Sequence, residues 1–126
     1  MSRASERGAR AERDAVALLL SAGFLQAERH NRAGATSDVG DVRGIPRSTI
    51  EVKDQERLNF SGWLAEAEAE RINAGNDYAI LIAKRRGKHM RDGYFVMRVE
   101  DGIKLLYEAL TADKTLRIQL RELLNE

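Results

Sequence analysis

The stretch IEVK at residues 50–53 constrains the fold of this chain more than any other feature, because apolar and charged residues alternate in it. Side chains two positions apart on a β-strand point to the same face of a sheet. The alternation therefore predicts a strand that projects Glu51 and Lys53 together from one face. The isoleucine and the valine of the same stretch would point into a core on the other face.

A second strand-like segment precedes this one, and the two predict an antiparallel hairpin with arms at residues 39–43 and 48–54. With the turn near the only proline of the chain, Val42 lies opposite Ile50, and Asp41 lies opposite Glu51. Opposed side chains have Cβ atoms about 4.5–5.5 Å apart, so two carboxylates there repel each other unless a cation lies between them. The alternative is a solvated strand face with an ordinary ion pair.

The rest of the chain shows amphipathic and apolar segments in turn. Apolar residues at helical spacing predict helices at residues 4–22 and 61–74, with Ser61 as the cap of the second. The nearly continuous apolar run at 78–83 predicts a strand buried on both faces. Weaker patterns predict strands at 24–32 and 94–99 and helices at 103–110 and 116–124. We expect a single domain, residues 1–126, of the α/β class: a mixed central sheet flanked by helices, in the order α-β-β-β-α-β-β-α-α.

The composition argues against several classes of protein. The formal net charge is only +1, so any nucleic-acid surface must come from local segregation of charge. The chain has no cysteine, and His30 and His89 do not stand at ligand spacing with other acids, which argues against a zinc site. No apolar run is long enough to span a bilayer and the first residues do not form a secretory signal, so we expect no membrane association and a cytoplasmic location.

Short motifs accompany the alternation: GARAER at 8–13, where the first helix opens, GF at 23–24, where it ends, GDV at 40–42 and IEVK at 50–53. Together with the element order, they resemble the PD-(D/E)xK nuclease superfamily, which has a restriction-endonuclease-like fold. Within it, the chain is most similar to small Holliday junction resolvases of archaeal and phage type. It departs from the pattern because no proline precedes Asp41, which lies only ten residues before Glu51. A spacing of thirteen would select Asp38, but the pairing register favours Asp41.

The resemblance implies a metal-dependent endonuclease that hydrolyses DNA phosphodiesters, with four-way junctions as substrate and a homodimer as the working form. Asp41, Glu51 and the carbonyl of Val52 would bind Mg²⁺ or Mn²⁺, which prefer oxygen ligands. Lys53 would orient the attacking water or neutralise charge on the phosphate. Glu12 would be a fourth catalytic residue, because a carboxylate on the apolar stripe of the first helix needs a partner. The alternative partner for Glu12 is a nearby arginine.

Other charged groups have two interpretations each. The turn after the apolar run at 78–83 is basic and contains Lys84, Arg85, Arg86 and Lys88. These residues are interpreted either as contacts to the phosphates of a DNA backbone or as an ordinary solvated turn. Arginines near the N-terminus form a basic helix face or serve only solubility: Arg3, Arg7, Arg10 and Arg13. A polar helix face beside Trp63 carries Glu66, Glu70 and Asn73. It is interpreted as exposed to solvent, with a role near the metal as the alternative.

Two alternatives to a resolvase remain open. One is another nuclease of the same superfamily, with a restriction-like, repair or flap-cleaving task. The other is a non-catalytic DNA-binding module that retains the fold. If the chain is encoded by a phage, the expected location is the cytoplasm of its host.

Overall fold

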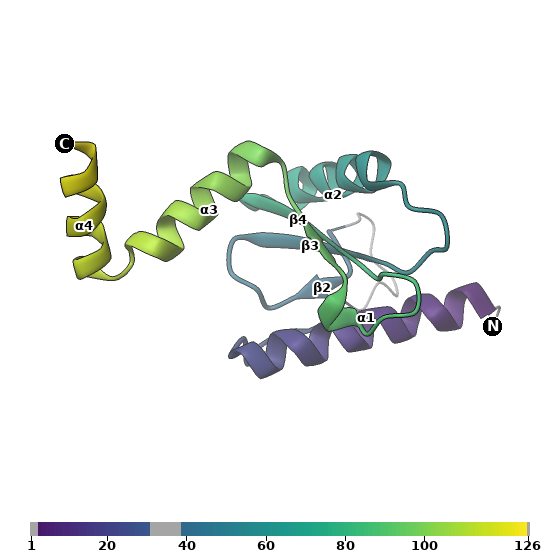
Figure 1. Cartoon of the computed structure of the whole chain (residues 1–126). Helices are drawn as coiled ribbons and strands as arrows, with labels where there is room; N and C mark the ends of the chain where they lie inside the picture. The colour runs from purple at the N-terminus through teal and green to yellow at the C-terminus, as the bar shows by residue number, and fades with distance from the viewer. Residues whose placement is uncertain (1–2, 31–38, 126) are drawn as a thin grey trace.

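The computed structural model describes residues 3–30 and 39–125 (Figure 1). In this part of the chain, one helix precedes three strands, a second helix, two more strands and two final helices. The elements are α1 (Arg3–Ala22), β1 (Glu28–Arg29), β2 (Val42–Arg43), β3 (Ser48–Lys53), α2 (Phe60–Ala74), β4 (Tyr78–Ala83), a 3₁₀ turn η1 (Met90–Asp92), β5 (Tyr94–Val96), α3 (Val99–Thr111) and α4 (Lys114–Leu124).

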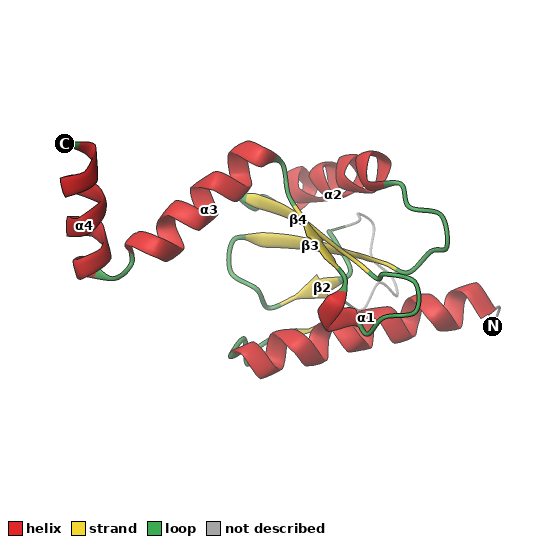
Figure 2. Ribbon diagram, viewed as in Figure 1, coloured by secondary structure: helices red, strands yellow, loops and turns green. Residues whose placement is uncertain are grey.

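The five strands form one mixed sheet in the order β1-β2-β3-β4-β5 (Figure 2). β3 and β4 are parallel, whereas the other neighbouring strands are antiparallel. The predicted α/β class with a mixed sheet is confirmed. Val42 pairs with Ile50, as the hydrophobic register predicted. β4 lies between two strands and is buried along almost its whole length, in agreement with its apolar run.

Helices α1 and α2 cover opposite faces of this sheet (Figure 1). On one face, Ala15 of α1 packs in a core that includes Ile50 and Val52 of β3. On the other face, Trp63 of α2 packs against Leu81 of β4. Because successive strand residues point to opposite faces, the even-numbered residues of β3 face α1 and the odd-numbered residues face α2.

Several element boundaries differ from the prediction. The strand expected at 24–32 is reduced to β1, because residues 24–27 form a turn in which the Ala27 N–H donates to the carbonyl of Phe24. Helix α2 is capped by Asn59, whose Oδ1 accepts a hydrogen bond from the Gly62 N–H at 3.1 Å. Ser61 is therefore not the cap. Helix α3 starts four residues earlier than expected, with acids in its first turn that complement the helix dipole.

The last two helices leave the sheet and extend away from it (Figure 1). Helix α3 is fastened to the domain by Glu108, which forms an ion pair of 3.4 Å with Arg47 and accepts a hydrogen bond from the Tyr78 hydroxyl. Arg47 has a positive φ of 63° in the turn between β2 and β3, and its guanidinium also lies over the Tyr78 ring. Within residues 3–30 and 39–125, no helix combines the length and apolarity needed to cross a bilayer.

Candidate metal centre

Strand β3 carries Glu51 and Lys53 on the face of the sheet that α2 covers. In the parallel pairing with β4, Glu51 lies beside Leu81 and Lys53 lies beside Ala83. Both apolar residues belong to the cluster that packs against Trp63 of α2. The two charged side chains project together, as the alternation predicted, and Lys53 Nζ lies 3.7 Å from Glu51 Oε1.

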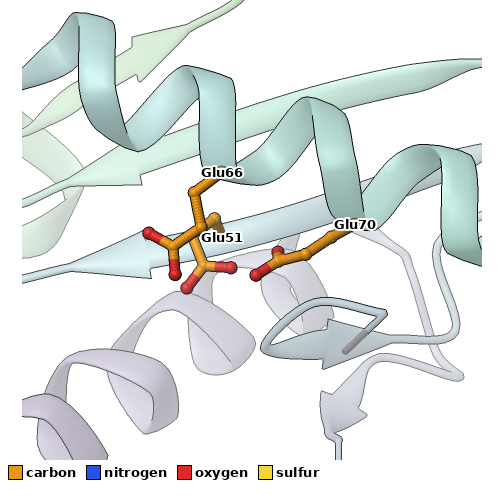
Figure 3. A group of neighbouring side chains, drawn as sticks. All are labelled: Glu51, Glu66 and Glu70. Atoms are coloured by element: carbon orange, nitrogen blue, oxygen red, sulfur yellow. The ribbon is translucent and has the colours of Figure 1, made fainter. Parts of the chain in front are cut away.

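Helix α2 brings two more carboxylates to this face. Glu66 and Glu70 are one helical turn apart, and Figure 3 shows their side chains converging on Glu51. Oxygen atoms of the three carboxylates all lie within 4.8 Å of one another. We call Glu51, Glu66 and Glu70 the carboxylate cluster. Glu70 is only 3% exposed, so the interpretation of this helix face as solvated is wrong at Glu70.

The electrostatics of the cluster are unfavourable without a cation. Burial raises the pKa of Glu51 to about 9, and the neighbouring Glu70 and Glu66 contribute to this shift. With every carboxyl ionised, Glu51 Oε2 has no hydrogen-bond donor among the described residues. A proton shared between Glu51 and Glu70 relieves the repulsion, since a protonated carboxyl can donate to its neighbour. A divalent cation bound between the carboxylates would relieve the same repulsion.

Lys53 is held on the exposed side of the cluster. Its Nζ lies 2.9 Å from Glu66 Oε2, and its side chain retains 18% exposure. Burial lowers the pKa of Lys53, but the hydrogen bond to Glu66 and the charges of the cluster outweigh burial, so the net shift is upward. Lys53 is therefore a protonated ammonium at neutral pH, suited to donate hydrogen bonds rather than to accept a proton.

Asp41 lies at the entry to β2 and is buried. Its main-chain N–H donates to the Ile50 carbonyl at 2.8 Å, and its Oδ2 accepts a hydrogen bond from the Val52 N–H at 2.8 Å. Gly40 makes this approach possible: its φ is 108°, and a Cβ there would lie 3.1 Å from the Ile50 carbonyl oxygen. The Asp41 carboxylate thus lies beside the main chain next to Glu51, but it is not a member of the carboxylate cluster.

Two further residues predicted for this hairpin have different outcomes. Val52 is buried, with its side chain in the α1 core and its N–H directed to Asp41. Its carbonyl as a metal ligand stays a prediction. Asp38, the alternative to Asp41, lies outside the described residues.

Glu12 is not brought to the cluster. Its Oε1 forms an ion pair of 3.3 Å with Arg29 Nε of β1, so its partner is an arginine from a strand rather than Lys53. The physical reason is the two-sided sheet. Helix α1 packs on the face that carries Ile50 and Val52, whereas Lys53 projects from the opposite face.

The basic turn after β4 lines a hollow of about 330 Å³ at the carboxyl ends of β3 and β4. The Lys84 N–H donates to the Lys53 carbonyl at 2.9 Å, so the hollow lies at the end of β3, the strand that carries Glu51. Arg7 and Arg10 of α1 line the same hollow. The other charged lining residues are Lys84, Arg85 and Arg86, with Asp14, Asp54 and Glu56. We call this site the basic hollow.

The members of the basic turn differ in their contacts. Arg86 forms an exposed ion pair of 2.8 Å with Glu56. The Arg85 guanidinium lies 5.6 Å from the centre of the Tyr94 ring and donates to the Asp92 carbonyl. Lys88 is exposed but does not line the hollow. Three of the four predicted DNA-contacting residues therefore gather in one place, and Arg7 and Arg10 join them.

Sequence reasoning gave Glu66 and Glu70 a role near the metal only as the less favoured interpretation, although a stronger signal was present. Positions 63, 66, 67 and 70 follow the helical spacing of one face. Trp63 and Ala67 are the apolar residues of this face, and the structure buries both together with Glu70. An acid that continues an apolar stripe requires a partner, and here the partner is Glu51.

Comparisons with known proteins add no relative: no model of a protein family matches the chain, and neither a curated protein nor a solved structure matches it significantly. Function is therefore inferred from the geometry of the site.

Proposed function

We propose that this protein is a metal-dependent endonuclease that hydrolyses the phosphodiester bonds of DNA. The observation that carries the proposal is the carboxylate cluster on β3 and α2, with the Lys53 ammonium 2.9 Å from Glu66 at its exposed side. Buried acids are costly unless they are paired or bind a cation. A cation site beside a protonated lysine suits the cleavage of an anionic phosphate.

The residues present fit Mg²⁺ or Mn²⁺. All three members of the cluster offer carboxylate oxygens, the donors that these hard cations prefer. Glu51, Glu66 and Glu70 would hold the ion, and Asp41 remains a proposed further ligand from the neighbouring strand. Such an ion lowers the pKa of water and withdraws charge from a phosphate when it is bound.

The side chains themselves have distinct tasks in this proposal. Lys53 donates hydrogen bonds to a non-bridging phosphate oxygen and stabilises the negative charge that grows there as the oxygen of the attacking water bonds to phosphorus. The bond from phosphorus to the leaving oxygen then breaks, and that oxygen takes a proton from water. Glu66 positions Lys53 through the 2.9 Å ion pair. Asp41 holds β2 against β3 through its hydrogen bond to the Val52 N–H, which keeps Glu51 beside α2.

DNA would also contact the basic hollow. Five basic residues line it against three acids, so its formal charge is positive. Arg side chains form bidentate hydrogen bonds with phosphate oxygens, and phosphate contacts position a protein on DNA without reading sequence. Lys84 follows β4 and its N–H donates to the Lys53 carbonyl, so the hollow lies at the same end of the sheet as Lys53. In this proposal the DNA backbone passes around that end of the sheet and contacts both sites.

The choice of a branched substrate has a different basis. Four-way junctions and a homodimeric working form follow from the resemblance to resolvases. Two sites related by a two-fold axis can cut two opposed strands of a symmetric junction. Other nuclease tasks, such as restriction-like, repair or flap cleavage, use the same chemistry, and a non-catalytic DNA-binding module would not need the cation.

The test offers the full chain a labelled four-way junction, a duplex, a flap and a single strand, with Mg²⁺, Mn²⁺ or EDTA. We expect paired nicks in the junction that require the cation and disappear in Glu51→Gln. Glu28→Gln, which changes an exposed acid of β1, is the matched control and should cleave normally. Cleavage of linear duplex alone would refute the resolvase assignment but keep the nuclease. If no DNA is cut with either cation, the enzyme proposal is wrong.

A further inference from the structure

Helices α3 and α4 expose a large share of their apolar side chains. Val99 is 77% exposed and Leu124 is 86% exposed. On α3 the uncovered residues follow a helical stripe: Val99, Ile103, Leu106, Tyr107 and Leu110. On α4 a second stripe runs through Leu116, Leu120, Leu123 and Leu124. Contiguous apolar surfaces of this kind mark interaction sites. We call the two helices the C-terminal arm.

The corner between the helices keeps α4 away from the rest of the domain. The Asp113 carboxylate caps α4 by accepting from the Thr115 N–H at 2.7 Å, and Arg117 Nε donates to the Thr111 carbonyl at 3.0 Å. None of the α4 residues is buried. Figure 1 shows α4 at the far end of the arm, turned away from the sheet. Its apolar stripe is therefore left for another molecule.

A groove beside α3 can bind such an apolar stripe. It has a volume of about 520 Å³ and lies between the end of β5 and the first three turns of α3. Its apolar lining consists of Phe95, Met97, Val99, Leu105, Leu106 and Ala109. An amphipathic helix binds such a groove through residues spaced at i, i+4 and i+7, which is the spacing of Leu116, Leu120 and Leu123.

The charges of the two helices are complementary. Helix α3 carries Glu100, Asp101 and Glu108 against Lys104, and its cap residue Arg98 lines the groove, so the net charge on the α3 side is −1. Glu100 stays 63% exposed beside Arg98 and is available to a second molecule. Helix α4 carries Lys114, Arg117 and Arg121 against one glutamate, a net charge of +2. The acidic helix with the groove and the basic helix with the leucine stripe occur in the same chain. In a dimer with a two-fold axis, α4 of each copy can therefore bind the α3 groove of the other copy, which gives two equivalent contacts.

We infer that the C-terminal arm is a dimerisation surface, in which α4 of one copy lies in the α3 groove of a second copy and the second copy reciprocates. The proposed function already takes a homodimer as the working form, and the C-terminal arm is assigned as the surface that forms it. That assignment does not depend on the nuclease activity, because no residue of the carboxylate cluster or the basic hollow takes part. In such a dimer, the leucine stripe of α4 and the apolar lining of the α3 groove are both removed from solvent.

Sedimentation velocity of the full chain over a concentration series tests the dimer, with the 14.1 kDa monomer as reference. Two charge variants test the pairing. Variant A carries Lys114→Glu and Arg121→Glu, and variant B carries Glu100→Lys and Asp101→Asn. In either variant alone, facing helices carry like charges, so the dimer should weaken at least about tenfold, which corresponds to about 1.4 kcal/mol. Mixing A with B restores opposite charges at both contacts, and the heterodimer should form.

Circular dichroism checks that both variants keep their helices, and Leu120→Gln with Leu123→Gln is a second route that should give monomers without changing charge. A wild-type chain that stays monomeric across the series would overturn the inference. So would variants A and B that dimerise as tightly as the wild type, because the dimer would then use another surface. A mixture of A and B that remains monomeric would rule out the reciprocal exchange.

Discussion

The Lys53 ammonium lies 2.9 Å from the Glu66 carboxylate, and this ion pair connects β3 to α2 at the exposed side of the carboxylate cluster. It joins two segments that the β3–α2 loop separates in sequence. Through it, the lysine of the IEVK stretch is held beside Glu66 and Glu51 at once. Protonation, cation binding and cleavage should all respond to changes in this group of side chains.

The metal-free protein should lose stability as the pH rises. Glu51 has its folded pKa raised to about 9, well above its ordinary value. Between the two values the folded state binds a proton that the unfolded state has released, so the free energy of unfolding falls with rising pH, by at most about 1.4 kcal/mol per pH unit. Denaturant unfolding in EDTA from about pH 5 to about pH 9 measures this slope. Glu51→Gln should flatten it, whereas Glu28→Gln should not.

A divalent cation should reverse this loss. Mn²⁺ or Mg²⁺ that binds only the folded state adds about 2.7 kcal/mol at a concentration one hundred times its dissociation constant. Thermal unfolding with increasing MnCl₂ should show a rising midpoint, more strongly at high pH, where the cluster is ionised. Glu70→Gln should weaken the effect, because it removes one carboxylate of the cluster. An equal rise in Glu70→Gln would show that the ion binds elsewhere.

Lys53→Met should abolish most cleavage without preventing folding. Removal of a donor that stabilises transition-state charge typically costs a factor of about 10²–10³ in kcat. Single-turnover cleavage of labelled DNA measures the loss, and Lys53→Arg, which keeps the charge, should retain part of the activity. Lys104→Met changes an exposed lysine of α3 and should leave the rate unchanged. Normal cleavage by Lys53→Met would remove Lys53 from the mechanism.

Asp41→Ala should destabilise the hairpin. The substitution leaves the Val52 N–H without its 2.8 Å acceptor, and an unsatisfied buried group costs about 1–3 kcal/mol. Asp41→Asn retains an oxygen acceptor at the same place and should cost less. Equilibrium unfolding of the two variants in EDTA separates this structural role from metal binding. Equal losses in both variants would indicate that the charge of Asp41, rather than its hydrogen bond, stabilises the hairpin.

Substitution of Arg7 and Arg10 by alanine should weaken binding to DNA of any sequence. For every phosphate that the variant no longer neutralises, the slope of log K against log salt should become shallower by about 0.9 for duplex DNA. Fluorescence anisotropy in EDTA over a salt series measures both affinity and slope without cleavage. Arg43→Ala, which removes an exposed arginine paired with Glu28, is the matched control. An unchanged slope in the Arg7 and Arg10 variant would place the DNA path away from the basic hollow.

Local periodicity was sufficient to predict much of the sheet. The register between Val42 and Ile50 follows from burying apolar residues of both arms on one face, since a slip of one residue would expose them all. The buried strand β4 follows from its continuous apolar run. Short strands such as β1 were predicted too long, because turn hydrogen bonds within residues 24–27 compete with strand pairing.

The sequence by itself determined that Glu51 and Lys53 share a face, because the period of a strand is a property of its own backbone. Only the tertiary structure decided which helix covers that face. Packing of α2 there brought Glu66 and Glu70 to Glu51, and packing of α1 on the other face directed Glu12 to Arg29. The face that a helix covers depends on contacts between distant segments, so the period of the helix alone cannot reveal it.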